Sequence, residues 1–443
     1  MTANKAVVIG AGLAGCEAAY QLARRGINVT LIEQKPNKLS PVHKSGLFAE
    51  LVCSNSFRAE GLYNAVGLLQ QEMRELDSLI IKAADHSRVP AGGALAVNRS
   101  QFAAFVTREI IEHKNIEVRR EEAVKLPQDG VVIAAPGPLV EGTLADDIIK
   151  TVGKGMLSFY DAAAPIVMGE TIDMSKAFYG SRYDKGGSDD YINCPMNEEQ
   201  YRAFYEALVS AERAPLHGFE QGRVFEGCMP VEVMAGRGFQ TLLFGPLKPV
   251  GLRAPGSDER PFAVVQLRRE DKEGRLYNLV GFQTNLKFGE QLRVFQMIPG
   301  LENAEFVRFG VMHKNAFLAS PGLLNNNYEL TKRPGLFFAG QITGVEGYVE
   351  SASSGLLAGL FAACDLLGQS RPSFSRNTAC GALAAYVSDY AGGDFQPMNI
   401  TFGIMNTLET RAKGKDKKRE TSERALEEIQ RIAQSLKVKE TTT

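Results

Sequence analysis

The stretch AVVIGAGLAG at residues 6–15, followed by VTLIE at residues 29–33, decides the fold of this chain. A short β-branched run leads directly into the pattern G-x-G-x-x-G. Apolar residues at helical spacing then occupy residues 14–25, before the second β-branched run begins. A buried strand, a glycine loop, a helix and a second strand in this order form the start of a βαβ unit. Residues 5–33 therefore predict a nucleotide-binding α/β fold.

Each glycine of this loop has a separate task in such a unit. Gly10 makes the tight turn, Gly12 admits a pyrophosphate, and Gly15 packs the helix against the strand. The helix N-terminus then faces the anion, and Glu33 at the end of the second strand accepts hydrogen bonds from a ribose. The residues predicted to contact the nucleotide are Gly10, Ala11, Gly12, Leu13, Ala14, Gly15 and Glu33.

Two features favour FAD over NAD as this nucleotide. The fingerprint starts five residues into the chain, and LFFAG at residues 336–340 resembles the C-terminal flavin contact of glutathione-reductase-type flavoproteins. We therefore expect Gly340 and Gln341 to contact the flavin. Many of those flavoproteins carry an acid at the position of Gln341.

The middle of the chain differs in character from its two ends. Residues 159–330 carry most of the aromatic residues, many prolines and several candidate strands. By contrast, a buried strand at residues 131–135 and an apolar helical pattern at residues 355–367 belong to the nucleotide-binding fold. We predict an α/β protein in which a glutathione-reductase-type FAD-binding Rossmann-like domain (residues 1–158 and 331–443) is interrupted by a mixed α/β insertion domain (residues 159–330).

Composition and charge are those of an ordinary globular chain. Of 443 residues, 44% are hydrophobic and 23% are charged, which is enough for two or three domains. Fifty basic and 51 acidic side chains give a net charge of −1, so a nucleic acid would have to bind a local patch. One basic cluster lies at residues 411–419, before apolar residues at helical spacing over residues 423–436. This cluster is either a solvated linker or a tail that faces RNA.

Six cysteines lie far apart, without a C-x-x-C pair or the Cys/His spacing of a zinc site. We expect no metal, no disulfide framework and a reducing cytoplasm. The first apolar run does not resemble a signal peptide, and the longest later run, residues 356–364, is too short to span a bilayer, so we expect no membrane segment.

The surroundings of the cysteines differ. Alanine-rich stretches indicate buried thiols at Cys16, Cys364 and Cys380, while Cys194 before a proline is ambiguous between a structural and a reactive role. Cys53 and Cys228 lie in polar, turn-rich segments. The residues alone leave open whether these two thiols are reactive or structural.

Five segments resemble one enzyme family. They are ELVCSNS at residues 50–56, RVPAGGALAV at 88–97, FEGCMPVE at 225–232, TLLFGPLKPVGL at 241–252 and VEGY at 345–348. With the fingerprint, they resemble the folate- and FAD-dependent tRNA (uracil-5-)-methyltransferase family from residue 5 to about residue 420. The larger flavoprotein of tRNA wobble-uridine carboxymethylaminomethylation shares the fingerprint. It carries a long additional C-terminal helical domain, for which this chain ends too early.

The resemblance implies roles for individual residues. Cys53 and Cys228 match the two active-site cysteines of the family, and His313 matches the imidazole that stacks the folate against the flavin. Without the resemblance, His313 is equally compatible with an ordinary surface or core histidine. Pro136 departs from the family, which more often has threonine there, and a proline removes a backbone donor near the cofactor.

The resemblance also implies the reaction, methylation at C5 of a uridine in the T-loop of tRNA. C5 is a poor nucleophile, but a cysteine thiolate that adds to C6 creates an enolate that is nucleophilic at C5. 5,10-Methylenetetrahydrofolate supplies the carbon. Reduced FAD, regenerated by NADH or NADPH, serves as methylene carrier and hydride source.

Two alternatives to this reaction remain, the same chemistry on a ribosomal-RNA uridine and a non-catalytic FAD-containing RNA-binding protein. A set of basic side chains either lines the route of the RNA, holds the glutamyl tail of the folate or is simply solvated. These residues are Arg268, Arg269, Lys287 and Arg293.

Overall fold

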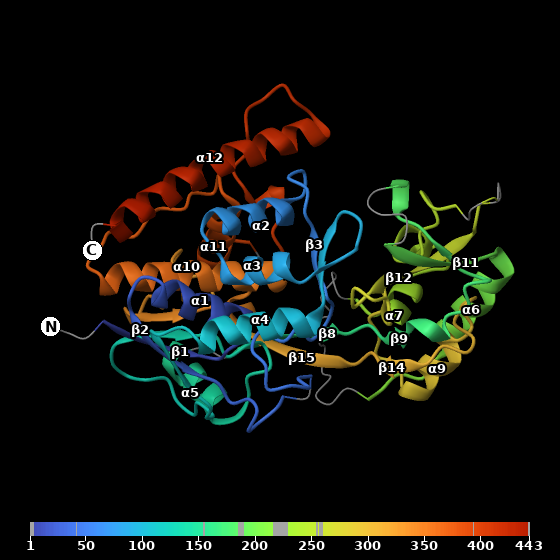
Figure 1. Ribbon diagram of the computed structural model, residues 1–443, viewed down its shortest axis with the longest axis horizontal. Coiled ribbons are helices and arrows are strands. Elements are labelled where there is room, and N and C mark those ends of the chain that lie inside the picture. The colour runs from blue at the N-terminus through green and yellow to red at the C-terminus, as the bar shows by residue number, and fades with distance from the viewer. Residues whose placement is uncertain are drawn as a thin grey trace.

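The computed structural model describes residues 4–441 except residues 41, 154–155, 185–189, 216–228, 254–255, 257–259 and 393. Figure 1 shows a large lobe that contains both ends of the chain and a small lobe formed by its middle. An antiparallel ribbon of β8 (Leu157–Ala162) and β15 (Met312–Phe317) runs between the two lobes (Figure 1).

The large lobe is built on a five-stranded parallel sheet with the strand order β16-β7-β1-β2-β6. Its strands are β1 (Lys5–Ile9), β2 (Asn28–Ile32), β6 (Ile116–Arg119), β7 (Val131–Ala134) and β16 (Leu336–Phe338). The structure confirms the three strands that the sequence predicts for this sheet, β1, β2 and β7, and it adds β6 and β16. Because all pairs are parallel, the carboxyl ends of the strands meet at one edge, where Rossmann-like folds bind their ligands. The predicted α/β fold class is confirmed.

Two helices pack closely above this sheet, α1 (Leu13–Ala23) and α10 (Tyr348–Leu366). Glycines in α10 set their separation. A Cβ at Gly355 would lie 2.1 Å from the carbonyl oxygen of Ala14, and one at Gly359 would lie 2.7 Å from that of Ala18. Any larger side chain would force the helices apart.

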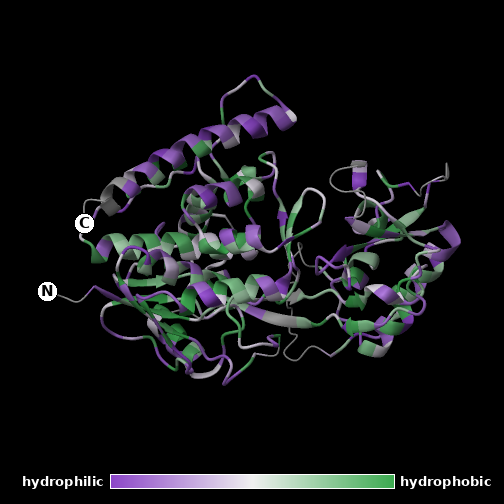
Figure 2. Cartoon of the chain, in the orientation of Figure 1, coloured by the Kyte–Doolittle hydropathy of each residue, from purple (hydrophilic) through white to green (hydrophobic). Residues whose placement is uncertain are grey.

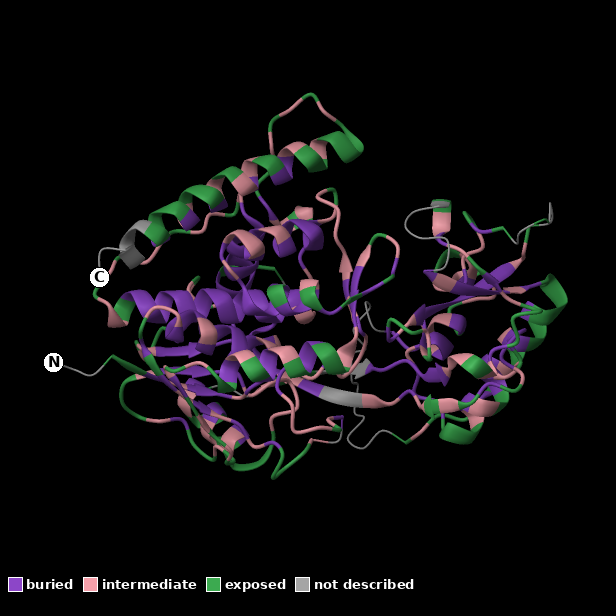
Figure 3. Cartoon of the chain, viewed as in Figure 1, coloured by how far each residue is buried: buried purple, intermediate pink, exposed green. Residues whose placement is uncertain are grey.

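Helix α10 starts seven residues before its predicted beginning at residue 355. Its first turns include Ser351, Ser353 and Ser354, which interrupt the apolar pattern of the sequence although all three are buried. Of the helices that the structure describes, α10 alone is long and apolar enough to cross a membrane, but 83% of the relevant window is buried inside the protein. Figures 2 and 3 show it as an apolar, buried rod at the centre of the large lobe.

Residues 56–111 add a three-stranded sheet and three helices, for which the sequence offers little signal. The elements are β3 (Ser56–Ala59), α2 (Ala65–Glu75), α3 (Leu79–His86), β4 (Arg88–Val89), β5 (Ala94–Val97) and α4 (Arg99–Ile111). The large lobe is completed by α5 (Gly142–Val152), α11 (Ala379–Asp389), α12 (Gly414–Thr441) and the 3-10 turns η4 (Gln341–Thr343) and η5 (Phe402–Ile404).

The small lobe contains a six-stranded sheet with the order β10-β11-β12-β13-β9-β14, in which all pairs are antiparallel. Its strands are β9 (Ile166–Met168), β10 (Phe178–Tyr179), β11 (Tyr191–Met196), β12 (Ala263–Arg269), β13 (Leu276–Leu279) and β14 (Phe306–Arg308). Its helices are α6 (Glu198–Ser210), α7 (Val231–Ala235), α8 (Thr241–Phe244) and α9 (Phe288–Phe295), with the 3-10 turns η1 (Gly169–Thr171) and η2 (Arg182–Asp184).

Each lobe has its own apolar core. One cluster of buried side chains extends from Ala164 to Ala304 in the small lobe, and a larger one fills the large lobe. The segment from Leu318 to Leu330 contributes to the larger core. The division into domains at residues 158 and 331 stays a prediction.

Candidate functional site

The glycine loop joins the end of β1 to the start of α1. Gly10 has a φ of +92°, and a Cβ there would lie 2.2 Å from the carbonyl oxygen of Ala135. A Cβ at Gly15 would lie 1.8 Å from the carbonyl oxygen of Gly10. By contrast, a Cβ at Gly12 would meet nothing within 4 Å. The fold itself therefore requires the two outer glycines, whereas the space beside Gly12 is open to a ligand.

Glu33 fixes this loop from the end of β2. Its Oε2 accepts a hydrogen bond from the backbone N–H of Ala11 at 2.6 Å, and its Oε1 accepts one from that of Lys35 at 2.9 Å. The residue is only 7% exposed. Since a carboxylate has about four acceptor sites, Glu33 retains capacity for the hydroxyl groups of a ribose.

The start of α1 has the properties of an anion site. Gly12 caps the helix without a side chain, so the N–H groups of Leu13, Ala14 and Gly15 receive no side-chain acceptor there. A phosphate accepts from such groups and is favoured by the helix dipole. The open space beside Gly12, these donors and the carboxylate of Glu33 together fit the pyrophosphate and ribose of FAD.

The second predicted flavin contact lies beside this loop. Gly340 follows β16 with a φ of +86°, and a Cβ there would lie 3.2 Å from the Cβ of Ala14. Its N–H donates to the Oγ of Ser354 at 2.7 Å. Gln341 donates through Nε2 to the Oε2 of Glu346 at 2.6 Å. An acid therefore does lie next to position 341, although it comes from five residues further along the chain.

Cys53 lies in a loop before β3, and hydrogen bonds to the backbone of this loop hold it in place. The Tyr348 hydroxyl, at the start of α10, accepts hydrogen bonds from the N–H groups of Cys53 at 2.8 Å and Ser54 at 3.0 Å. Arg99 donates to the carbonyl oxygen of Cys53 at 3.1 Å. The thiol donates to the carbonyl oxygen of Ala162, with a sulfur–oxygen distance of 3.6 Å. These contacts fix a half-buried thiol where the two lobes meet the ribbon.

Three arginines from three elements surround this loop. Arg99 pairs through two nitrogens with Glu270, at 2.6 and 3.1 Å, and Arg268 donates to the Oγ of Ser54 at 2.8 Å. Arg308 donates to the backbone of the same loop. Burial lowers the pKa of Arg268 and that of Arg308. Burial also acts to lower the pKa of Arg99, but the charge of Glu270, the hydrogen bonds to it and smaller contributions from neighbouring groups together outweigh burial and raise that pKa. The cluster holds two more positive than negative charges, which suits an anionic ligand.

Cys228 falls outside the residues that the structure describes. The chain that follows it is anchored in the small lobe. Glu232 in α7 is buried, and it accepts hydrogen bonds from the Thr284 hydroxyl at 2.9 Å and from the Asn285 N–H at 2.8 Å.

The structure describes the backbone of His313 in β15 but not its side chain. His313 pairs with Asp161 of β8, and the neighbouring Met312 pairs with Ala162. Since the carbonyl oxygen of Ala162 accepts from the Cys53 thiol, the fold brings strand position 313 near Cys53.

The predictions of buried thiols are confirmed for Cys16, Cys364 and Cys380, and Cys194 is also buried. Burial raises the pKa of Cys194 to about 12, and it also raises the pKa of Cys16 and that of Cys380. These thiols pack in the core.

Sequence reasoning missed several residues that shape the Cys53 loop, among them Arg99 and Arg308. The residues around such an arginine in the sequence do not indicate that it contacts a loop from a distant element. Arg268 is not a solvated charge, because it is buried against the Cys53 loop. Lys287 and Arg293 form exposed ion pairs with neighbouring glutamates and do not reach this site.

This chain is similar to several known proteins. A family model described as glucose inhibited division protein A matches residues 5–370. The methylenetetrahydrofolate--tRNA-(uracil-5-)-methyltransferase TrmFO of Acetivibrio thermocellus is 59% identical over 420 residues, which cover 95% of this chain and 96% of that protein. The protein of the same description from Desulfitobacterium hafniense is 58% identical, with coverages of 96% and 97%.

A solved structure of Aquifex aeolicus GidA has a TM-score of 0.71 to this chain, covering 98% of this chain and 73% of that one. The two sequences are 16% identical, so this likeness supports the fold alone.

Proposed function

The chain belongs to the methylenetetrahydrofolate–tRNA-(uracil-5-)-methyltransferase family, and we propose that it methylates C5 of a uracil in tRNA with methylenetetrahydrofolate as carbon donor. The observation that carries this proposal is the identity of more than half of all residues over at least 95% of the chain. We further propose the T-loop as the position of the target uridine and the cytoplasm as the location of the protein.

FAD is the proposed cofactor, with NADH or NADPH as its reductant. Gly12, the first turn of α1 and Glu33 would hold its pyrophosphate and ribose, and Gly340 and Gln341 would lie beside its flavin end. When bound and reduced, FAD would carry the one-carbon unit and supply the hydride that turns a methylene into a methyl group.

Cys228 is the proposed nucleophile. Its thiolate adds to C6 of uracil, forming a C–S bond while the C5=C6 electrons move toward the C4 carbonyl oxygen. C5 then bonds to the one-carbon unit, and loss of the C5 proton to a base breaks the bond between that carbon and its nitrogen carrier, which leaves an exocyclic methylene on C5. A hydride, which reduced FAD would supply, converts this methylene to a methyl group. Elimination of the thiolate from C6 restores the ring double bond.

Cys53 is proposed to protect the one-carbon unit or to assist the proton transfer. Its loop belongs to the large lobe and is fixed by Tyr348 and Arg99, which supports a place near the cofactor and not near the base. His313 is proposed to stack on the folate, and the proximity of its strand position to Cys53 supports that role. The surrounding arginines provide positive charge for the carboxylates of a folate.

Nucleoside analysis of RNA from a strain that lacks the gene tests this function. We expect 5-methyluridine to disappear from tRNA, to remain unchanged in ribosomal RNA, and to return with the wild-type gene but not with Cys228→Ala. Loss from ribosomal RNA only would contradict the proposed substrate, and full activity of both cysteine variants would favour a non-catalytic RNA-binding protein.

A further inference from the structure

The first turns of α12 carry a concentration of positive charge that the proposed chemistry does not use. Residues 411–419 contain six basic side chains and one acidic side chain, in a chain whose net charge is −1. The sequence left open whether this cluster is a linker. The structure shows that α12 begins at Gly414, so most of it is helical. The α12 basic patch consists of Arg411, Lys413, Lys415, Lys417 and Lys418.

The α12 basic patch is exposed and free of ion pairs within the part of the chain that the structure describes. Its members are exposed, except for Lys417, which is partly buried. In the same cluster, Arg419 is paired, with Asp416 at 4.0 Å and Glu423 at 3.7 Å. The charge of the patch is therefore uncompensated and available to an anionic partner.

Aromatic rings lie next to these lysines. The Nζ of Lys415 is 5.7 Å from the centre of the Tyr63 ring, and that of Lys418 is 6.0 Å from the centre of the Phe402 ring. Tyr63 is 44% exposed, which is high for so large a side chain. Lysines interleaved with an exposed aromatic ring are typical of surfaces that bind nucleic acid, where the cations contact phosphates and the ring stacks on a base or sugar.

The patch rests on a fixed support. Further along α12, Ala425, Ile429, Ala433 and Leu436 are buried, and this helix packs on α2. The hydroxyl of Ser422 donates to the carbonyl oxygen of Leu62 at 2.6 Å, which ties α12 to the loop that carries Tyr63.

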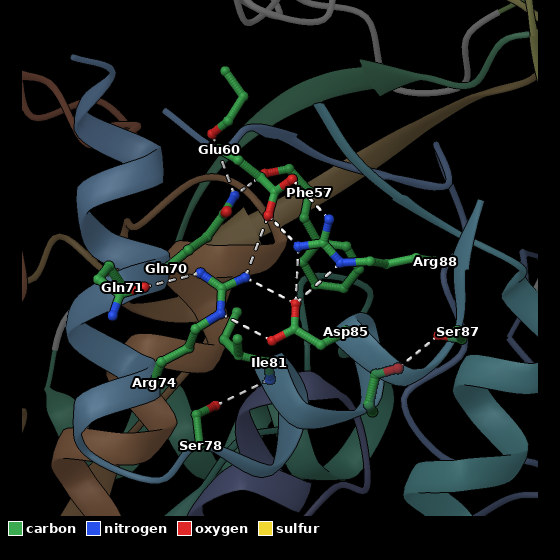
Figure 4. A network of polar contacts seen from close by, with 12 residues as sticks. Phe57, Glu60, Gln70, Gln71, Arg74, Ser78, Ile81, Asp85, Ser87 and Arg88 are labelled. Atoms are coloured by element: carbon green, nitrogen blue, oxygen red, sulfur yellow. Dashed lines mark hydrogen bonds and ion pairs between the residues drawn. The ribbon is translucent and has the colours of Figure 1, made fainter. Parts of the chain in front are cut away.

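A charged network holds Glu60, three residues before Tyr63 (Figure 4). Arg74 donates through two nitrogens to Asp85, both at 2.9 Å, and Arg88 donates to Glu60 at 2.9 Å and to Asp85 at 3.1 Å. Burial acts to raise the pKa of Asp85, but the hydrogen bonds and positive charges of Arg74 and Arg88 together outweigh burial and lower that pKa. Bidentate, mutually connected pairs of this kind order the loop where isolated surface pairs would not.

The chain connects the patch closely to Cys53. Tyr63 follows Cys53 by ten residues, and β3 lies between them. The two Cα atoms are therefore at most about 36 Å apart. Figure 1 shows β3 running from the region between the lobes toward the first turns of α12.

We propose that the α12 basic patch and Tyr63 form a docking surface for the sugar-phosphate backbone of a tRNA stem, while the loop with the target uridine enters the site between the lobes. This inference rests on the proposed function for the identity of the RNA. This surface increases the affinity for tRNA and fixes the position of the stem on the protein. It does not distinguish nucleotide sequences, because its contacts are to phosphates.

The test compares two triple variants of the full-length holoprotein with the same change in charge. The patch variant is Lys413→Gln/Lys415→Gln/Lys418→Gln, and the control is Lys114→Gln/Lys125→Gln/Lys150→Gln, which removes exposed lysines elsewhere on the large lobe. The control includes Lys150 in α5, which Figure 1 places on the opposite side of the lobe from α12. Binding of an unmodified tRNA transcript is measured between about 0.05 and 0.2 M salt, because affinity that comes from phosphate contacts falls steeply over this range.

We expect the patch variant to bind tRNA about 10- to 100-fold more weakly at about 0.1 M salt, with a salt slope smaller by about 2, because each lost phosphate contact removes roughly 0.7 to 0.9 of the slope. The control should bind as the wild type does, and replacement of the same three lysines by arginine should preserve binding. Turnover at saturating tRNA, the melting temperature and the FAD content should be unchanged.

Equal binding by the patch variant and the control would overturn the docking surface, and so would an equal loss in both. Because binding is measured without turnover, this result is separate from the proposed function, whose failure would appear as wild-type protein that makes no 5-methyluridine in any tRNA.

Discussion

Replacing either of two glycines three residues apart by alanine should damage the protein in different ways. At Gly12, the backbone has φ −76° and ψ −170°, which alanine also adopts, and the new methyl group would meet no atom within 4 Å. At Gly15, the methyl group would lie 1.8 Å from the carbonyl oxygen of Gly10, a distance that real Cβ atoms essentially never show. Gly12→Ala should therefore weaken only the binding of the ligand, whereas Gly15→Ala should destabilise the fold.

The magnitudes separate the two variants clearly. Gly15→Ala must move α1 away from its loop by more than about 1 Å, and overpacking of this kind costs about 1–3 kcal/mol, of which helix propensity returns about 1. We expect the melting temperature of the FAD-free protein to fall by about 2–4 °C for a loss of about 2 kcal/mol, because the entropy of unfolding increases with chain length. Gly12→Ala should change stability by about 1 kcal/mol at most. It should lower the affinity for FAD by about 10- to 100-fold, because one charge-assisted hydrogen bond to the phosphate is lost.

The assay is calorimetric titration of the FAD-free proteins with FAD, together with their thermal unfolding. Wild-type affinity of Gly12→Ala for FAD would refute the placement of the pyrophosphate at the start of α1. A melting temperature of Gly15→Ala equal to that of the wild type would refute the claim that this glycine is required by packing.

Three further predictions concern other parts of the molecule. A tRNA with 5-fluorouridine at the target position has no C5 proton to lose, so it should trap a covalent adduct with the wild type and with Cys53→Ala but not with Cys228→Ala, as judged by denaturing gels; the opposite pattern would exchange the two roles. Arg99→Lys keeps the charge but cannot form the forked pair with Glu270, so kcat should fall while the 5-fluorouridine adduct still forms, and an unchanged kcat would contradict the role of Arg99 in positioning the Cys53 loop. Burial raises the pKa of Glu72 from 4.5 to about 7 against the hydrogen bonds that it accepts at the start of α11. Between these two pKa values, the folded state keeps the proton of Glu72 while the unfolded state releases it. The contribution of this proton to the free energy of unfolding is therefore complete below pH 4.5 and is lost as the pH rises toward 7, by up to about 1.4 kcal/mol per pH unit. Denaturant titrations of wild type and Glu72→Gln should therefore diverge over this range, and parallel profiles would contradict the assignment.

The parts of the fold that the sequence predicts are those with a local pattern. The β-branched runs at β1, β2 and β7, the apolar run at β16 and the glycine loop are each encoded within a few consecutive residues. The two-residue strand β4 and the polar helix α2 carry no comparable signal, because their formation depends on partners far along the chain.

The site shows the same division. The candidates Gly12, Glu33 and Cys53 come from motifs, whereas the arginines that position the Cys53 loop come from long-range packing. Arg268 reaches Ser54 from 214 residues away, and in the sequence it resembles any solvated arginine. The sequence also does not predict that the basic cluster is helical, because the buried apolar residues of α12 begin only after the cluster ends.

The most direct test of the central claim is label transfer with purified protein, FAD, NADPH and a tRNA transcript. One reaction contains methylenetetrahydrofolate labelled in its methylene carbon, and the other contains S-adenosylmethionine labelled in its methyl group. After digestion of the tRNA to nucleosides, we expect label in 5-methyluridine from the folate only, and none when NADPH is omitted. Label in 5-methyluridine from S-adenosylmethionine, or none from the folate with all components present, would contradict the account.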